Sequence, residues 1–158
     1  MDLEKKPRKW SAYESALGLL ARREHSLLEL KTKLKQKGYE KSEIQEAVEK
    51  AVLRGEVSEE RFKRSRVREL IRRNFGFRYI VQDLSSKGVS LDAEAFEEIA
   101  EAMEDQRESP FEVYWRKIFQ HEFVPDPKLE NRFLRTAVRK GFEFSEAKKF
   151  LEMKRQNQ

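Results

Sequence analysis

The chain has 158 residues, of which 40% are charged and 38% hydrophobic, and it contains no cysteine. This length suffices for one ordinary domain or a few small helical units, and the polar composition argues against one large core. The absence of cysteine excludes disulfides and cysteine-based zinc sites, and no apolar run approaches membrane-spanning length. We therefore expect a cytoplasmic protein without a membrane span, whose net charge of +5 favours an acidic partner.

Apolar residues recur at helical spacing along almost the whole chain. Each group of such residues forms an apolar stripe along one helix face. In chain order, the stripes cover Tyr13–Leu20, Leu27–Leu34, Ile44–Val52, Phe62–Ile71, Phe77–Leu84, Ala95–Met103, Phe111–Phe119, Leu129–Val138 and Ala147–Leu151. No stretch alternates with a period of two for long enough to predict a strand. The spacing therefore predicts an all-α fold of about nine helices.

Residues that cap helices stand at the ends of these stripes. Ser11 and Ser26 each precede a glutamate by three residues, which is the spacing of a capping box. Ser109 and Asp126 each precede a proline, a residue that is favoured at the first position of a helix. Glycine often ends a helix, because it adopts the left-handed conformation without steric strain. Four stripes are followed by one: Gly38, Gly55, Gly88 and Gly141.

Three of these helix ends resemble one another and stand about fifty residues apart. Each has a lysine, a glycine and an apolar residue in succession, at residues 37–39, 87–89 and 140–142. Four residues after each glycine stands a residue that commonly begins a helix: Ser42, Asp92 and Ser145. A basic residue with a glycine is also how single helices end, but three copies with matching flanks favour an internal repeat.

The repeat predicts an elongated, curved tandem array of three-helix repeats, because such units bury their faces against their neighbours. The spacing of the turns predicts a lead-in helix and three repeats, the last of them incomplete: residues 1–25, 26–75, 76–125 and 126–158. This architecture offers long surfaces to a partner and no obvious deep pocket.

The chain carries no convincing catalytic constellation. His25 and His121 lie in different predicted units without a ligand at helical spacing, so a metal role is not expected. A phosphate-binding glycine loop and a nucleophile elbow are both missing from the sequence. We therefore expect neither an enzyme nor a cofactor.

Charge is segregated along the middle of the chain. Residues 61–78 hold eight basic residues and a single acid, Glu69, whereas residues 92–108 are strongly acidic. Four of the arginines fall within about 80° of one helix face and form what we call the 61–72 ridge: Arg61, Arg64, Arg68 and Arg72. Like charges at this spacing repel, and phosphates or carboxylates of a partner would relieve the repulsion. The acidic segment of the same chain could instead neutralise the ridge.

Three segments resemble the RecX family. Residues 16–26 (Ala-Leu-Gly-Leu-Leu-Ala-Arg-Arg-Glu-His-Ser), followed by Glu-Leu and Lys-Leu pairs at 29–30 and 33–34, are similar to the opening of RecX proteins. Residues 55–62 resemble the family's Gly-x-apolar-x-Asp-x-Arg-Phe segment, and residues 80–89 its Ile-x-x-Glu-Leu-x-x-Lys-Gly-Ile element. Residues 13–90 carry the close resemblance.

The chain departs from the family pattern at two places. Glu59 stands where the family usually has aspartate, and Gly76-Phe77 replaces the usual Gly-Pro. Residues 91–158 hold few recognisable motif positions.

The resemblance implies tandem three-helix repeats that lodge in the helical groove of the RecA–DNA filament. There they inhibit ATP hydrolysis, strand exchange and the co-protease function of RecA in the SOS response. For this chain we predict a monomer whose contact residues are the 61–72 ridge and, more weakly, Arg73, Arg78, Lys37 and Lys87. Two alternatives stay open: a helical protein that binds single- or double-stranded DNA directly, and a scaffold for another acidic partner.

Overall fold

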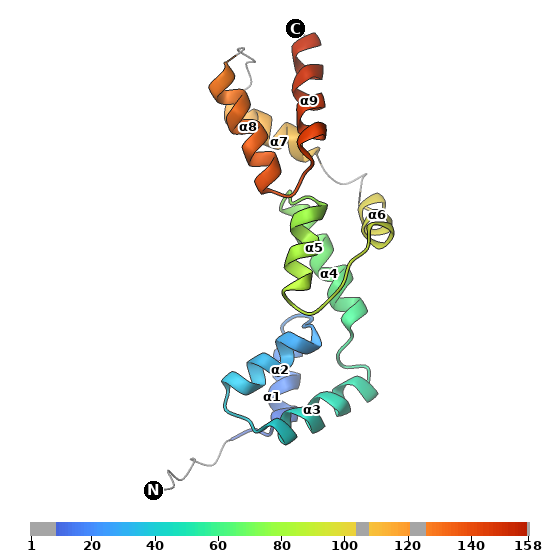
Figure 1. Ribbon diagram of the computed structural model, residues 1–158. Coiled ribbons are helices and arrows are strands. Elements are labelled where there is room, and N and C mark those ends of the chain that lie inside the picture. The colour runs from blue at the N-terminus through green and yellow to red at the C-terminus, as the bar shows by residue number, and fades with distance from the viewer. Residues whose placement is uncertain (1–8, 104–107, 121–125, 158) are drawn as a thin grey trace, which may run out of the picture. The chain divides into compact units, whose positions relative to one another are not determined.

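The computed structural model describes residues 9–103, 108–120 and 126–157, and every regular element within these ranges is a helix (Figure 1). In chain order the helices are α1 (Ala12–Leu20), α2 (Leu27–Gln36), α3 (Lys41–Leu53), α4 (Glu59–Arg72), α5 (Phe77–Ser85), α6 (Ala93–Glu101), α7 (Pro110–Phe119), α8 (Pro127–Arg139) and α9 (Phe144–Gln156). The predicted all-α fold is confirmed.

The chain divides into two compact units. The first contains the residues up to Ser65 together with Lys87–Val89, and the second contains Arg66–Ser86 together with the residues from Ser90 onward. Helix α4 thus begins in the first unit and ends in the second.

The first unit has a hydrophobic core between α1, α2 and α3. Ala16 of α1, Leu30 and Leu34 of α2, and Ala51 of α3 are completely buried in it. Small residues on α1 and α3 allow these two helices to pack closely, and branched residues of α2 fill the remaining space. The helix predicted as a separate lead-in is therefore part of this core.

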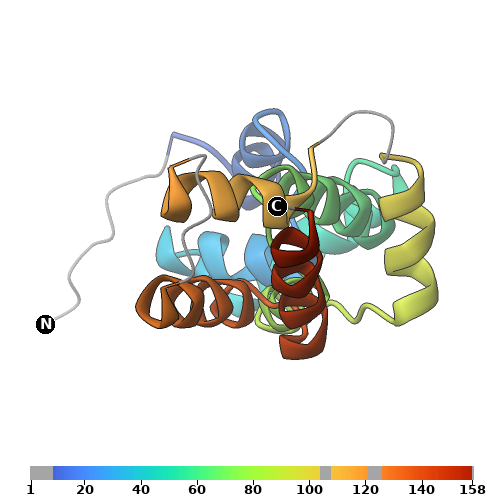
Figure 2. The same cartoon turned by 90° about the horizontal axis from the view of Figure 1, so that it is seen from above.

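The second unit has a core in which aromatic rings predominate. Phe133 and Ala137 of α8 are completely buried between α7 and α9. Phe133 stacks on Phe150 with ring centroids 5.6 Å apart, and Phe111 of α7 lies 5.5 Å from Phe150. Figure 1 and Figure 2 both show α7, α8 and α9 side by side. Both cores begin one helix earlier than the repeats predicted at residues 26 and 126.

Two of the three lysine–glycine turns lie inside these helical groups, between their second and third helices. The glycines have positive φ, +85° at Gly38 and +93° at Gly141, as predicted. Ser42 and Ser145 do not begin the next helix, because the chain enters it two residues after each glycine. Glu40 and Glu143 stand at the N-cap, and their amides donate to carboxylates three residues later, at 2.7 and 3.2 Å.

The remaining predicted caps are largely confirmed. The capping boxes of Ser11 and Ser26 are both complete, and the Asp92 carboxylate accepts a hydrogen bond from the Ala95 amide at 2.8 Å. Asp126 accepts from the Lys128 amide at 2.8 Å, ahead of the proline that opens α8. Ser109 precedes the proline of α7 but makes no side-chain cap bond.

Two glycines bring the α4–α5 junction against the α8–α9 turn in the second unit. The Gly76 amide donates to the Lys140 carbonyl at 2.7 Å, and the Arg78 amide donates to the Gly141 carbonyl at 3.2 Å. A β-carbon on Gly76 would lie 2.6 Å from the Gly141 carbonyl oxygen. This backbone contact therefore requires glycine at position 76.

We expect Gly76→Ala to lower the free energy of unfolding by about 1–3 kcal/mol, since the new methyl group must push two backbones apart. Urea denaturation followed by circular dichroism measures this change. The control is Gly18→Ala in α1, where an added β-carbon meets nothing within 4 Å. This control should instead stabilise the chain by roughly 0.5–1 kcal/mol, because alanine favours the helix. Equal effects of the two substitutions would contradict the close approach.

Candidate partner-binding surface

Arg61 begins the 61–72 ridge, and its guanidinium group is held by the first unit. Its Nε donates to the Glu24 carboxylate at 2.8 Å, and its terminal nitrogen donates to the carbonyls of Gly55 and Glu56 at 3.0 and 3.2 Å. These bonds connect the first turn of α4 to the loop that precedes it and to the α1–α2 connection. Arg61 therefore fixes how α4 begins.

The Arg-Arg-Glu-His-Ser segment at residues 22–26 has a structural role in this unit. The buried Ser26 caps α2, and Arg23 forms an ion pair with Glu29 at 3.0 Å. His25 is buried, and its Nδ1 lies 3.0 Å from the Arg23 carbonyl oxygen. Burial lowers the pKa of His25 below its usual value, because the charged ring would lose its hydration. His25 is thus part of a helix start, as predicted; His121 lies outside the described residues.

We expect the chain to lose stability at mildly acidic pH through His25. The unfolded chain takes up a proton at about pH 6.5, whereas the folded chain takes it up only at lower pH, so acid favours unfolding. The free energy of unfolding should fall between about pH 7.5 and pH 5.5. His25→Asn keeps a nitrogen that donates to the Arg23 carbonyl but cannot titrate, so it should flatten this slope. Urea titrations of both chains at the two pH values measure the free energy of unfolding. If it falls by the same amount in the variant as in the unaltered chain, the assignment to His25 is refuted.

The remaining ridge arginines differ in their surroundings. Arg64 forms an ion pair with Glu60 at 3.0 Å, one helical turn away. Arg68 and Arg72 are exposed, and neither makes a side-chain hydrogen bond or ion pair within the described parts of the chain. Their spacing of four residues places both side chains on one face of α4. This pair is the part of the ridge that is open to a partner.

The second half of α4 is attached to α5 by a half-buried ion pair. Arg66 forms two parallel hydrogen bonds with the Asp83 carboxylate, both at 2.8 Å, and a third bond with Glu69 at 2.8 Å. The side chain of Asp83 is only 11% exposed, so solvent screens the pair poorly. These acceptors raise the pKa of Arg66 further, and the guanidinium stays charged. The contact orients the face of α4 that carries Arg68 and Arg72.

We expect Asp83→Ala to destabilise the folded chain by about 2–3 kcal/mol, because it leaves the Arg66 guanidinium half-buried without its bidentate partner. Thermal unfolding by calorimetry measures the loss. Glu97→Ala removes a carboxylate from an exposed position of α6 and should change stability by less than about 0.5 kcal/mol. A loss no larger than that of Glu97→Ala would show that the ion pair contributes little.

The four weaker candidates lie at separate places. Arg73 pairs with Glu69 at 3.5 Å, and Arg78 pairs with Glu143 at 2.6 Å. Lys37 is exposed at the end of α2, and Lys87 is half-buried before its glycine. Two of the four are thus engaged in ion pairs within the chain, and the contact role of all four stays a prediction.

Lys140, the lysine of the third lysine–glycine turn, was not predicted as a contact residue. Its Nζ lies 4.1 Å from the centre of the Phe75 ring, over which the Arg73 guanidinium also lies, at 5.5 Å. Desolvation lowers the pKa of Lys140, and the positive charges of Arg139, Arg73 and Lys117 lower it further. Basic groups from α7, from the end of α8 and from the residue after α4 thus influence one another in the second unit, a proximity that sequence spacing could not reveal.

Other classes of site find no support in the described residues. Within residues 9–103, 108–120 and 126–157, no group of three histidine or acidic side chains could hold a metal ion. No helix of the described chain is long and apolar enough to cross a membrane. The surface features that stand out are therefore the charged faces of the helices.

A family profile described as "RecX, first three-helix domain" matches residues 12–50, which cover α1, α2 and most of α3. The chain is 41% identical to the regulatory protein RecX of Legionella pneumophila (strain Corby) over 81 residues, which are 51% of this chain and 54% of that protein. That alignment thus spans about half the length of the relative. The regulatory protein RecX of Vibrio vulnificus (strain CMCP6) is 31% identical over 140 residues, 89% of this chain and 90% of that protein.

The fold has a counterpart among solved structures. The crystal structure of RecX from Lactobacillus salivarius superposes with a TM-score of 0.64, covering 90% of this chain and 93% of that chain. Its sequence identity of 19% makes this a likeness of fold alone.

Proposed function

Because the chain belongs to the RecX family of regulatory proteins, we propose that it binds the RecA recombinase in its filament on DNA and inhibits it. The inhibited activities are ATP hydrolysis, strand exchange and the co-protease function in the SOS response. The proposal rests on family membership together with a helical surface that offers charge to a partner. It requires binding only and no catalytic residue of this chain.

The observation that carries the proposal is the exposed pair of arginines on a firmly held helix. Arg61 fixes the start of α4, and the bond from Arg66 to Asp83 fixes its second half. Arg68 and Arg72 are consequently presented in one orientation before any partner arrives, which lowers the entropy that binding must overcome. Each guanidinium can bind a carboxylate in a bidentate manner.

Inhibition further requires that the chain binds one state of RecA better than another. A ligand shifts an equilibrium only by the difference between its affinities for the two states. A chain that contacts neighbouring RecA subunits would bind best to one spacing of those subunits and less well to any other. This provides a route from surface binding to reduced ATP hydrolysis.

Direct binding to DNA is the second candidate function. Arg68 and Arg72 are compatible with phosphates as well as carboxylates. DNA binding by arginines releases condensed counterions, so its affinity should fall steeply with salt, with a slope of about −0.7 to −0.9 per phosphate contacted. Salt titration of binding to naked DNA separates this function from binding to RecA.

We expect the double substitution Arg68→Glu with Arg72→Glu to raise the concentration needed for half-maximal inhibition of RecA by roughly tenfold, because two attractive charges become repulsive. The measurement is DNA-dependent ATP hydrolysis by the cognate RecA on single-stranded DNA, with the chain titrated below one molecule per RecA. Stability should change by less than about 0.5 kcal/mol, since both side chains are exposed.

The matched control is Lys31→Glu with Lys35→Glu on α2, an exposed pair with the same spacing and the same change of charge. It should inhibit like the unaltered chain. Equal inhibition by both double variants would refute the role of Arg68 and Arg72. Inhibition that begins only when the chain saturates the DNA would favour competition for DNA instead.

A further inference from the structure

Helix α8 carries a second basic ridge, whose residues also recur at helical spacing. Its members lie at positions i, i+4, i+7 and i+11, and at 100° per residue they fall within about 60° of the helix face. We call this set the 128–139 ridge: Lys128, Arg132, Arg135 and Arg139. All four residues are exposed, and they extend over about 16 Å of α8. The ridge is more tightly aligned than the one on α4.

The 128–139 ridge is not neutralised within the described chain. None of its four members forms an ion pair there; Arg135 donates only to the Asn131 carbonyl, at 3.4 Å. The acid of the same helix, Glu130, lies on another face and pairs with Arg155 of α9. Four unpaired positive charges on one helix face repel one another, and this repulsion lowers the free energy of unfolding. An acidic partner would relieve that cost.

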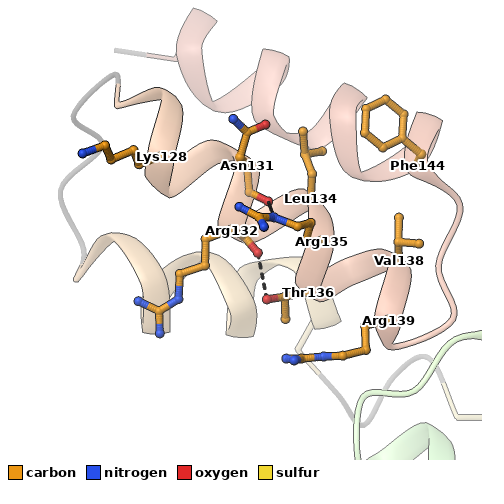
Figure 3. A pocket seen from close by; sticks show the side chains of 9 residues that line it. All are labelled: Lys128, Asn131, Arg132, Leu134, Arg135, Thr136, Val138, Arg139 and Phe144. Carbon is orange, nitrogen blue, oxygen red and sulfur yellow. Dashed lines mark hydrogen bonds between the residues drawn. The ribbon is translucent and has the colours of Figure 1, made fainter.

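An apolar margin runs beside the ridge. Val138 is 45% exposed and Phe144, at the start of α9, is 55% exposed, while Leu134 lies half-buried between them and the ridge. Figure 3 shows Arg132 and Arg139 pointing to one side of α8, and Leu134, Val138 and Phe144 pointing to the other. The two sets line an open groove of about 1080 Å³.

From this arrangement we infer that the α8 groove is a docking site for an acidic protein segment that also carries bulky apolar side chains. The segment's carboxylates would pair with the 128–139 ridge, and its apolar residues would cover Val138 and Phe144. Protein interfaces typically combine an apolar centre with arginine in this way. The inference rests on the proposed function, in which the partner is RecA in its filament.

A nucleic acid fits the groove less well than a protein segment. Surfaces that bind single strands stack successive bases on several aromatic rings, and the groove has one ring, that of Phe144. Its other apolar side chains, Leu134 and Val138, are aliphatic. Duplex DNA presents mainly phosphates to an approaching helix face, and these would leave the apolar margin uncovered.

In the second unit, the segment that follows α4 comes close to the end of α8. Arg73, which follows the last residue of α4, and Arg139 both lie close enough to Lys140 to influence it electrostatically. Gly76 and Gly141 hold the backbones of the two regions together. The end of the 128–139 ridge is therefore attached to the segment that follows α4.

The test measures the affinity of the fluorescently labelled chain for filaments of cognate RecA, assembled on single-stranded DNA with a non-hydrolysable ATP analogue. The same DNA without RecA is measured in parallel. One variant reverses charge (Arg132→Glu with Arg139→Glu), and a second removes the apolar margin (Val138→Ser with Phe144→Ser). Lys148→Glu with Lys149→Glu, at exposed positions of α9, is the control with the same change of charge.

We expect charge reversal to weaken filament binding roughly tenfold and loss of the apolar margin to weaken it several-fold, while the control stays within about twofold. The apolar variant should bind naked DNA like the unaltered chain. If the unaltered chain binds filaments and neither α8 variant loses affinity, the inference fails and the proposed function stands. If only charge reversal matters, and it weakens naked DNA binding equally, the groove binds nucleic acid and the inference is overturned. Absence of filament binding by the unaltered chain would overturn the proposed function, and this inference with it.

Discussion

The close contact between Gly76 and Gly141 is the constraint on which the arrangement of the second unit depends. The two backbones approach so closely that neither position has room for a side chain, and two hydrogen bonds connect them. The contact brings the end of α4 against the turn between α8 and α9. Phe75 lies beneath Lys140 at this junction. The last residues of α4, which include Arg68 and Arg72, and helix α8 therefore belong to one compact unit although they are far apart in sequence.

The residues of the family-like segments mainly position the surface. Glu24 of the first segment binds Arg61 of the second, and Asp83 of the third binds Arg66. His25 is buried and hydrogen-bonded to the backbone. These contacts determine where α4 begins and how it is rotated. These motif residues therefore position the helix that carries Arg68 and Arg72, two exposed side chains that belong to no short motif.

Ion pairing distinguishes arginines that stabilise the fold from arginines that can recognise a partner. A guanidinium that already binds a carboxylate within its own unit, as in Arg61 and Arg66, would have to break that bond before binding another molecule. Arg68, Arg72 and the 128–139 ridge have no such bond within the described residues. Sequence spacing alone treats all of these residues alike, since a helix face can be calculated without knowledge of its neighbours.

The sequence by itself determined the helices, because apolar periodicity, capping serines and glycine turns act within a few residues of each other. The family resemblance and the 61–72 ridge were also visible in the sequence. The 128–139 ridge could have been predicted by the same calculation of the helix face. Only the tertiary structure decided the grouping of helices around the cores, since α1 joins the first core through contacts that local patterns do not encode. The tertiary structure also decided which arginines form ion pairs and placed Lys140 close to Arg73. Both outcomes depend on residues that lie far apart in the chain and meet only on folding.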